Sequence, residues 1–330
     1  MKTTHNPDDI NLTEWSELAL SSTFSSAFQT PESHRLFTSC PEFTTFFTAV
    51  TDDSNHIKGL ICGAIHRNGC FPFNLLTRRA IVYGGPLLSP DISDDELLAL
   101  LNATTSFLKH KAIYLEIRFS EDYSRFHEVF RKANIKPYIS LDAIIDTSSH
   151  EVIARNIQKR KFRQIRAALR NDIEFVENPT SEDITAFYPR LKSLHWRVSH
   201  KPMPSLDFFL KLVKSPIGVV TLLKHNGKII AFDAALFLVD RKLYHLYSVG
   251  EDRLQKQLAP SSVALFKLLN LAADRHIPLC GLMGAGNPSK PYGVRDFKIR
   301  MGATTPDYKR ARKFFCPLVY DIATLFYDQL

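Results

Sequence analysis

Basic side chains able to bind an anion gather near the end of the sequence. Arg295, Lys298 and Arg300 follow a loop of small and turn-forming residues at 284–291, and a short apolar strand is predicted before that loop, at 278–283. Because glycine has no side chain and tolerates positive φ, such a loop lets the backbone approach a ligand closely. The pattern predicts the rim of a site for an anionic ligand. A surface loop with solvated basic residues has the same pattern, so both interpretations stay open.

A second basic group recurs at helical spacing over residues 151–171, where one helix is predicted. Five cationic side chains fall within roughly 80° of one another on a helix that turns 100° per residue, and apolar residues fall opposite them. These five are Arg155, Lys159, Arg163, Arg166 and Arg170. The stripe is either a contact surface for the phosphates of a nucleotide or RNA, or a solvated face of a basic protein.

One carboxylate stands out because it interrupts the apolar run at 229–239. A buried carboxylate is costly unless it is paired, so Asp233 either faces a cleft with His245 or Tyr247 of the next predicted strand, or belongs to a satisfied buried network. Arg197, in the sequence His-Trp-Arg, is a candidate contact for an acceptor group, or packing plus a surface charge.

Composition excludes several classes of site. The 330 residues are 45% hydrophobic with a formal net charge of +8, which favours two domains and anionic partners. The five cysteines show no CxxC or Cys/His ligand spacing, which argues against a zinc site and a disulfide framework and fits a reducing compartment. With no apolar leader and no window of eighteen apolar residues, the sequence predicts a cytoplasmic protein.

The predicted elements make the chain an α/β protein. Strands alternate with helices through residue 148, and Ser93 with Glu96 forms a capping-box signature for a helix at 94–110. A polar break at 146–150 is the expected domain boundary. The second half reads β-α-α-β-β-β-α-β, with an Asn226-Gly227 hairpin turn, an order typical of acyltransferase-type α/β domains.

Four motifs occur in an order that resembles the FemABX family of aminoacyl transferases and its relatives with BioF2-like or GNAT-type acetyltransferase domains. They span about residues 83 to 303, and two depart from the family pattern, with Ala167 in place of a lysine and Met301 in place of an aromatic residue. The motifs are Tyr83-Gly84-Gly85-Pro86, the RQIRAA segment at 163–168, the GKIIA segment at 227–231 and the Gly293-x-x-x-Phe297-Lys298-x-x-x-Gly302-Ala303 segment.

The resemblance implies two tandem GNAT-like domains from a duplicated unit, each a mixed sheet flanked by helices. The expected domains are 1–148 and 149–315, with 316–330 a candidate to return to the first domain. The second would carry the active site. The long helical hairpin that contacts tRNA in some members of the family has no counterpart in this sequence.

The resemblance also implies transfer of an acyl or aminoacyl group to an amine by direct attack, since the sequence has no convincing Ser-His-Asp or Cys-His set. Lys298 would stabilise developing charge, Phe297 would pack beneath the donor, and Asp233 is a candidate catalytic residue. Replacement of Lys298 by alanine is expected to abolish transfer and leave the melting temperature nearly unchanged.

The donor is expected to be acyl-CoA or aminoacyl-tRNA, with no tightly bound cofactor and no metal. The segment at 253–259 lacks the glycines of a standard CoA loop, so the helix N-terminus after it is the remaining anion cradle. The candidate donor-binding residues are Arg253, Ser261, Ser262, Asn287, Tyr292 and Arg295. The candidate acceptor- or phosphate-binding residues are Arg155, Lys159, Arg163, Arg166 and Arg197.

The acceptor is expected to be a small-molecule or nucleotide-linked amine, with a peptidoglycan precursor as one candidate and tRNA as a candidate partner. The alternative is a non-catalytic protein of this fold that binds RNA or another anionic partner through the basic helix.

Overall fold

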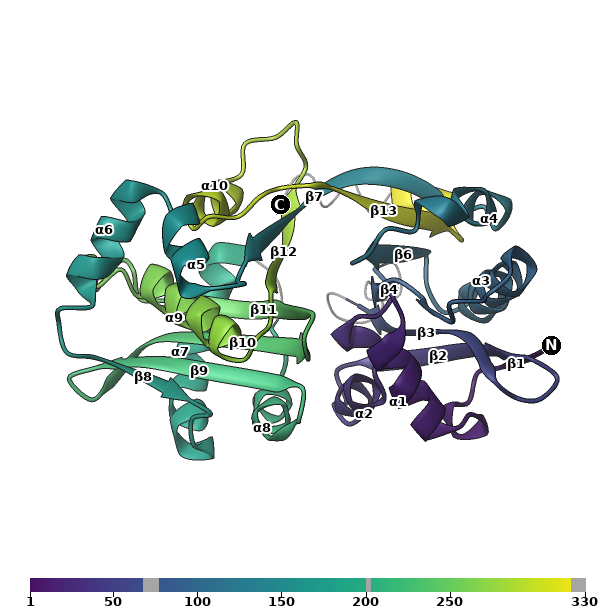
Figure 1. The fold of residues 1–330 in the computed structure, drawn as a ribbon, viewed down its shortest axis with the longest axis horizontal. Coiled ribbons are helices and arrows are strands. Elements are labelled where there is room, and N and C mark those ends of the chain that lie inside the picture. The colour runs from purple at the N-terminus through teal and green to yellow at the C-terminus, as the bar shows by residue number, and fades with distance from the viewer. Residues whose placement is uncertain (68–76, 200–202, 322–330) are drawn as a thin grey trace. The chain divides into compact units, whose positions relative to one another are not determined.

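The computed structural model describes residues 1–67, 77–199 and 203–321, and it divides into two compact units (Figure 1). Unit 1 comprises Met1–Ile139 and Tyr308–Leu330, and unit 2 comprises Ser140–Asp307. The first division lies earlier than the boundary expected after residue 148, because strand β7 (Lys136–Asp146) runs through it without a break. The chain returns to unit 1 at Tyr308, through strand β13 (Asp307–Phe314), and not at 316.

Unit 1 is a mixed sheet with helices on both faces. Its strand order is β1-β2-β3-β4-β6-β13-β7, and β5 pairs with β3. The remaining strands are β1 (Lys2–Thr4), β2 (Thr44–Thr51), β3 (Ile57–His66), β4 (Arg79–Gly84), β5 (Leu87–Leu88) and β6 (Tyr114–Phe119). The helices are α1 (Leu12–Ser21), α2 (Pro31–Thr38), α3 (Asp94–Leu108) and α4 (His127–Lys132), with 3-10 turns at Pro7–Asp9, Ala27–Gln29 and Ser124–Phe126.

Alternation along the strands assigns the two faces of this sheet. Phe46 of β2 packs in the cluster of buried side chains that includes Leu97 and Leu100 of α3, whereas its neighbour Phe47 packs with Trp15 of α1. Successive strand residues point to opposite faces, so α3 and α1 cover opposite sides. The capping box predicted at the start of α3 is confirmed, since Ser93 and Glu96 each accept from the other's backbone N–H.

Unit 2 is a second mixed sheet, with strand order β7-β12-β11-β10-β9-β8. Its strands after β7 are β8 (Ile173–Glu177), β9 (Gly218–His225), β10 (Lys228–Leu238), β11 (Lys242–Gly250) and β12 (Leu279–Gly286). Its helices are α5 (His150–Asn156), α6 (Lys159–Ala168), α7 (Ser181–Ser199), α8 (Leu206–Lys214), α9 (Pro260–Asp274) and α10 (Gly293–Arg300). The Asn226-Gly227 turn joins β9 to β10 with positive φ at both residues, as a type I′ hairpin requires.

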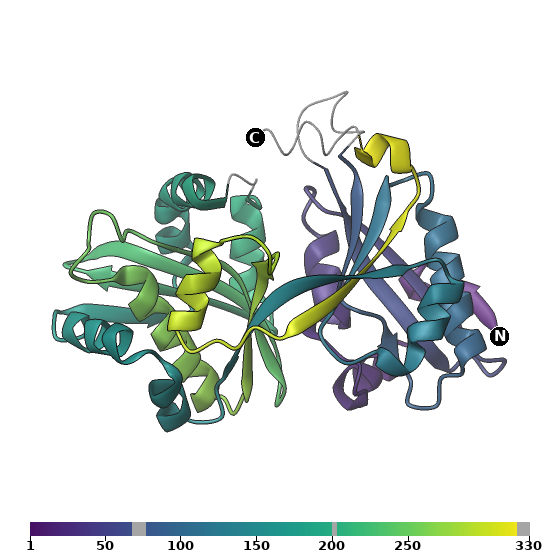
Figure 2. The ribbon, with the colours of Figure 1, turned by 90° about the horizontal axis from the view of Figure 1, so that it is seen from above.

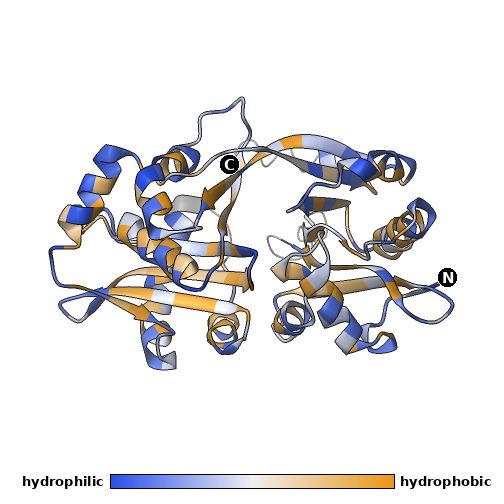
Figure 3. Cartoon of the chain, in the orientation of Figure 1, coloured by the Kyte–Doolittle hydropathy of each residue, from blue (hydrophilic) through white to orange (hydrophobic). Residues whose placement is uncertain are grey.

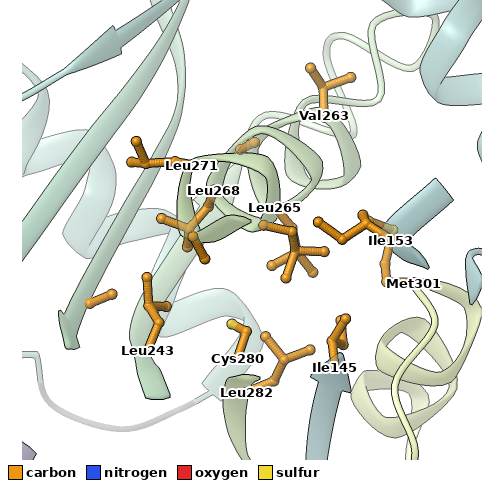
Figure 4. Close-up of a cluster of buried hydrophobic side chains, with 14 of the residues drawn as sticks. Ile145, Ile153, Leu243, Val263, Leu265, Leu268, Leu271, Cys280, Leu282 and Met301 are labelled. Carbon is orange, nitrogen blue, oxygen red and sulfur yellow. The ribbon is translucent and has the colours of Figure 1, made fainter. Parts of the chain in front are cut away.

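Helix α9 holds the core of unit 2 together. Proline occupies its first turn, where the missing N–H costs no hydrogen bond. Leu265 and Leu268 face Leu243 of β11, Cys280 of β12 and their neighbours in one apolar cluster (Figure 4). Each fully buried leucine contributes roughly 1.5–3 kcal/mol to stability. The strand–helix–strand units β11-α9-β12 and β4-α3-β6 both join parallel neighbours, which fits a duplicated unit.

The single helix expected over 151–171 is wrong. Two helices, α5 and α6, occupy this span, because Ile157 is extended and buried, and the Gln158 N–H donates to the Arg300 carbonyl at 3.1 Å. Figure 3 shows hydrophobic residues along the strands of both units and long hydrophilic stretches on α6. Among the helices of the described residues, none is long and apolar enough to span a membrane.

Candidate active site

The candidate site begins where two parallel strands of unit 2 separate. β11 and β12 pair at their starts, with Tyr244 opposite Gly281 as the last matched pair. Beyond that pair, β12 follows β7 through two irregular steps, at Gly284 and Gly286, while β11 stays paired with β10 as far as Gly250. The facing edges of β11 and β12 therefore separate beyond Tyr244 and Gly281.

A cavity of about 460 Å³ within unit 2 opens beside this separation. Residues of β11, β12, α7, α9, α10 and the loop after β11 line it, and apolar walls alternate with charged side chains. The lining residues are Arg190, Leu194, Arg197, His245, Leu246, Ser248, Val249, Gly250, Glu251, Asp252, Arg253, Leu254, Ser261, Leu265, Leu282, Gly293, Val294, Phe297 and Lys298. Apolar pockets with a few converging polar groups are the usual form of a small-ligand site.

A buried Asp–His pair borders the cavity. Asp233 of β10 is 1% exposed, and its Oδ1 lies 2.7 Å from Nε2 of His245, which lines the cavity from β11. The β-bulge between Ala234 and Ala235 sets the register that brings these two side chains together. A carboxylate on Nε2 fixes the tautomer that leaves Nδ1 as the proton acceptor, the arrangement of a general base.

The second oxygen of this carboxylate is unusual. Oδ2 of Asp233 is buried and has no hydrogen-bond partner within the described part of the chain. A buried polar atom without a hydrogen-bond partner lowers the stability of the folded protein, and a role in catalysis is one explanation for such an atom. Among the described residues, this carboxylate therefore depends on the hydrogen bond that its Oδ1 makes with His245.

Lys298 of α10 makes three backbone contacts. Its Nζ donates to the carbonyls of Leu282, Met283 and Gly284 at 2.5, 3.2 and 2.9 Å. These consecutive carbonyls converge because Met283 has a φ of 58°, a strained conformation for a residue other than glycine. The ammonium thus holds the irregular part of β12 where this strand leaves β11.

Neither a family model nor a curated protein sequence matches this chain. Solved structures do. The crystal structure of FemX matches 98% of this chain and 99% of its own length with a TM-score of 0.71 at 12% identity. A tandem GNAT protein from the clavulanic acid biosynthesis pathway matches 95% of this chain and 98% of its own, with a TM-score of 0.59 at 12% identity. L-PGS from Bacillus licheniformis matches 93% and 91%, with a TM-score of 0.57 at 13% identity.

The chain has the tandem GNAT fold. This confirms the expected α/β fold class of two GNAT-like domains, each a mixed sheet with helices. Identities of 12–13% establish the fold alone.

The first turn of α9 already binds a carboxylate side chain of the protein itself. Asp252 accepts from the Ser261 N–H at 3.2 Å and from the Ser261 hydroxyl, while the Ser262 N–H donates to Ala259. The cradle expected at Ser261 and Ser262 therefore holds a carboxylate of the chain itself. Gly250 lies against this turn, where a Cβ would come within 2.5 Å of the Ser261 nitrogen.

The side chain of Ser262 instead accepts from a lysine that the sequence analysis did not identify. Lys161 of α6 donates to the Ser262 hydroxyl at 3.2 Å and lies 5.9 Å from the centre of the Phe297 ring. Burial and the Arg300 charge lower the pKa of Lys161. Phe297 itself is half-buried and lines the cavity, so α6 and α10 meet beside it.

Three of the candidate donor-binding residues shape the loop after β12. The Arg295 guanidinium donates to the carbonyls of Asn287 at 2.8 Å and Lys290 at 2.6 Å. The Asn287 side chain accepts from the Ser289 N–H, and Tyr292 lies against Gly286, whose φ is 81°. None of Asn287, Tyr292 and Arg295 belongs to the described cavity lining, whereas Arg253 does.

The candidate acceptor-binding residues divide in the same way. Arg197 lines the cavity from α7, near Arg190, whose Nε donates to Glu251 at 2.6 Å. The other four are exposed on α5 and α6, and the described cavity lining does not include them: Arg155, Lys159, Arg163 and Arg166. No cluster of His, Cys, Asp or Glu suited to a metal ion occurs within the described residues.

Proposed function

We propose that this protein is an acyltransferase that moves an acyl or aminoacyl group from an activated donor to an amine within the unit 2 cavity. The observation that carries the proposal is the buried Asp233–His245 pair at the cavity between the separating strands. The tandem GNAT fold shared with FemX supports it at the level of the fold.

The chemistry follows from the pair. His245 Nδ1 takes a proton from the acceptor ammonium or amine, and Asp233 stabilises the resulting imidazolium. The amine nitrogen then attacks the donor carbonyl carbon, a C–N bond forms, and the bond to the ester oxygen or thioester sulfur of the donor breaks. The leaving oxygen or sulfur takes up a proton, either from the attacking nitrogen or from the His245 imidazolium. Backbone N–H groups of β11 and β12 beyond Tyr244 and Gly281, where the two strands no longer pair, are suited to the negative charge on the carbonyl oxygen.

The structure of the first turn of α9 favours a donor that has no diphosphate bound there. Asp252 already holds the first turn of that helix, and a second anion there would meet its charge. This favours an aminoacyl ester over acyl-CoA bound in the manner of a glycine-rich loop. The acceptor class, a peptidoglycan precursor or another amine, rests on the family resemblance of the sequence motifs.

His245→Gln tests the proposal. We expect the rate of transfer to fall by about 10²–10⁴-fold, the usual contribution of a general base, with little change in melting temperature. Transfer from charged tRNA and from acetyl-CoA to a panel of amines is followed by mass spectrometry, and Asp233→Asn should show a smaller loss with an altered pH profile. His225→Gln, at the distant β9–β10 turn, is the matched control. Equal transfer rates in His245→Gln and the control would show that His245 is not the general base.

A second candidate function is the binding of RNA through α6. Lys159, Arg163, Arg166 and Arg170 are all exposed along this helix or just after its end. Such a surface neutralises phosphates without need of the cavity.

A further inference from the structure

A second polar cluster lies in unit 1, far along the chain from the Asp–His pair. Glu116 of β6 is 2% exposed and accepts from three arginines. Arg118 Nε lies 2.6 Å from Oε1, Arg312 Nε lies 2.9 Å from Oε2, and Arg310 Nη1 lies 3.4 Å from Oε1.

Strand register explains how the cluster forms. β13 pairs with β6 so that Arg312 lies opposite Glu116 and Arg310 opposite Arg118. The residues between them in sequence, Ile117 and Ala311, pack in the α3 core. The four charged side chains therefore share the opposite face of the sheet.

Positive charge exceeds negative charge in this cluster. Three guanidinium groups surround one carboxylate, so the formal sum is 3 − 1 = +2. Burial alone would raise the pKa of Glu116, but Arg118 and Arg312 outweigh it and lower this pKa to about 2. The carboxylate is therefore ionised, and the excess of two positive charges remains.

A fourth arginine, Arg79 of β4, lies near this cluster. Burial lowers the pKa of His66 to about 4, and the charges of Arg79 and Arg118 both add to this lowering. Nε of Arg79 is buried and has no hydrogen-bond partner in the described part of the chain.

Two of the three arginines lie over aromatic rings. Arg118 stacks on the Tyr83 ring at 5.1 Å and Arg312 on the Tyr138 ring at 4.0 Å. The side chains of Arg118, Arg310 and Arg312 remain 29%, 15% and 26% exposed. A planar guanidinium offers its N–H groups along its edge, in a fork that matches an oxyanion.

We propose that this face of unit 1 is a binding site for a phosphate or diphosphate group, held by Arg118, Arg310 and Arg312. A doubly charged oxyanion balances the excess of two positive charges, whereas a single carboxylate does not. This proposal does not rest on the chemistry proposed for unit 2, and its test measures binding alone.

Calorimetric titration of the full chain with inorganic phosphate, inorganic pyrophosphate and a nucleoside diphosphate tests this site. Tighter binding of the nucleoside diphosphate than of pyrophosphate would identify a phosphate carried on a larger molecule, and equal binding would identify the free ion. Arg310→Gln should weaken binding about tenfold, the value of one charge-assisted hydrogen bond. Arg310 has the longest contact with Glu116, so Arg118 and Arg312 still pair that carboxylate in the variant.

Arg131→Gln, an exposed arginine of α4 in the same unit, is the matched control and should bind as the unchanged protein does. Glu116→Gln removes the negative charge from the cluster and should therefore tighten anion binding severalfold. This variant tests the proposal if Arg310→Gln does not fold. The proposal is overturned if the unchanged protein does not bind these anions. It is also overturned if both cluster variants bind like the control, or if only Arg163→Glu with Arg166→Glu, on α6, weakens binding.

Discussion

Lys298 shows how one side chain can hold the backbone of a site in place. Its ammonium satisfies the carbonyls of Leu282, Met283 and Gly284, in a strand segment that is strained at Met283. Lys298→Ala should therefore lower the free energy of unfolding by about 2–3 kcal/mol, because polar groups lose their charged donor. This replaces the expectation, drawn from the sequence, of an unchanged melting temperature.

Urea titration followed by circular dichroism measures this change, and Lys256→Ala, an exposed lysine of the loop before α9, is the control. If Lys298→Ala unfolds at the same urea concentration as that control, the three carbonyl contacts contribute nothing and the sequence-based expectation stands.

Individual residues of the site differed in how far the sequence could reveal them. Asp233 could be singled out because a carboxylate breaks an apolar run, and its neighbouring strand supplied two candidate partners, of which His245 makes the hydrogen bond. Lys161, Glu251 and Asp252 could not, because a charged residue in a helix or loop has no local signal. Only the tertiary fold brings them to the cavity and to the start of α9.

At the level of elements, the turn before α9 holds an alanine in the left-handed conformation, which glycine would adopt without strain. Ala259 has a φ of 43° at the position just before Pro260. An alanine in the left-handed conformation costs roughly 1–2 kcal/mol. Glycine removes this cost, but it loses more conformational entropy on folding, which offsets part of the gain. Ala259→Gly should raise the free energy of unfolding by up to about 1 kcal/mol.

Thermal and urea unfolding measure this gain. Ala264→Gly, in the regular part of the same helix, should instead destabilise by at least about 1 kcal/mol, the cost of glycine within a helix. Similar losses in both variants would show that Ala259 is not strained.

The exposed cations of α6 lead to a separate prediction about RNA affinity. Arg163→Glu with Arg166→Glu should reduce RNA affinity and flatten its dependence on salt, because fewer counterions are released on binding. Fluorescence anisotropy with labelled tRNA at several salt concentrations measures both. Unchanged affinity at low salt would exclude α6 as an RNA-binding surface.

Elements specified by local signals were predicted well. The capping box at Ser93 and the Asn226-Gly227 turn depend on residues within one turn of each other. The break between α5 and α6 was missed, because the Gln158 N–H is satisfied by Arg300, more than a hundred residues later. Neither proline nor glycine marks that position.

At the level of the whole molecule, acid should destabilise unit 1 in two steps. The pKa of His66 is about 4 when folded and 6.5 in its ordinary state, so its stabilising contribution is present above pH 6.5 and lost as pH falls to 4. Glu116, with a pKa of about 2 against 4.5, loses its contribution between pH 4.5 and 2. From these differences each contributes roughly 3 kcal/mol at neutral pH.

Trp15 lies in unit 1, and the other of the two tryptophans, Trp196, lies in unit 2. Denaturant titrations of a Trp196→Phe protein, followed by Trp15 fluorescence, therefore report on unit 1. His66→Gln should weaken the dependence of stability on pH between 6.5 and 4 and leave the part due to His34, whose pKa burial also lowers. His56→Gln, on an exposed turn, should leave the dependence as it is. An undiminished dependence in His66→Gln would assign it to other groups.

Strand β13 also has a consequence for synthesis of the chain. It pairs with β6, although the whole of unit 2 separates the two in sequence (Figure 2). A ribosome therefore completes unit 2, which is one continuous stretch, before it delivers the strand that pairs with β6. Until then the edge of β6 and the carboxylate of Glu116 lack their β13 partners. For that interval the nascent N-terminal half presents an unpaired strand edge, and Arg118 alone of the three arginines is present to pair Glu116, because Arg310 and Arg312 arrive only with β13.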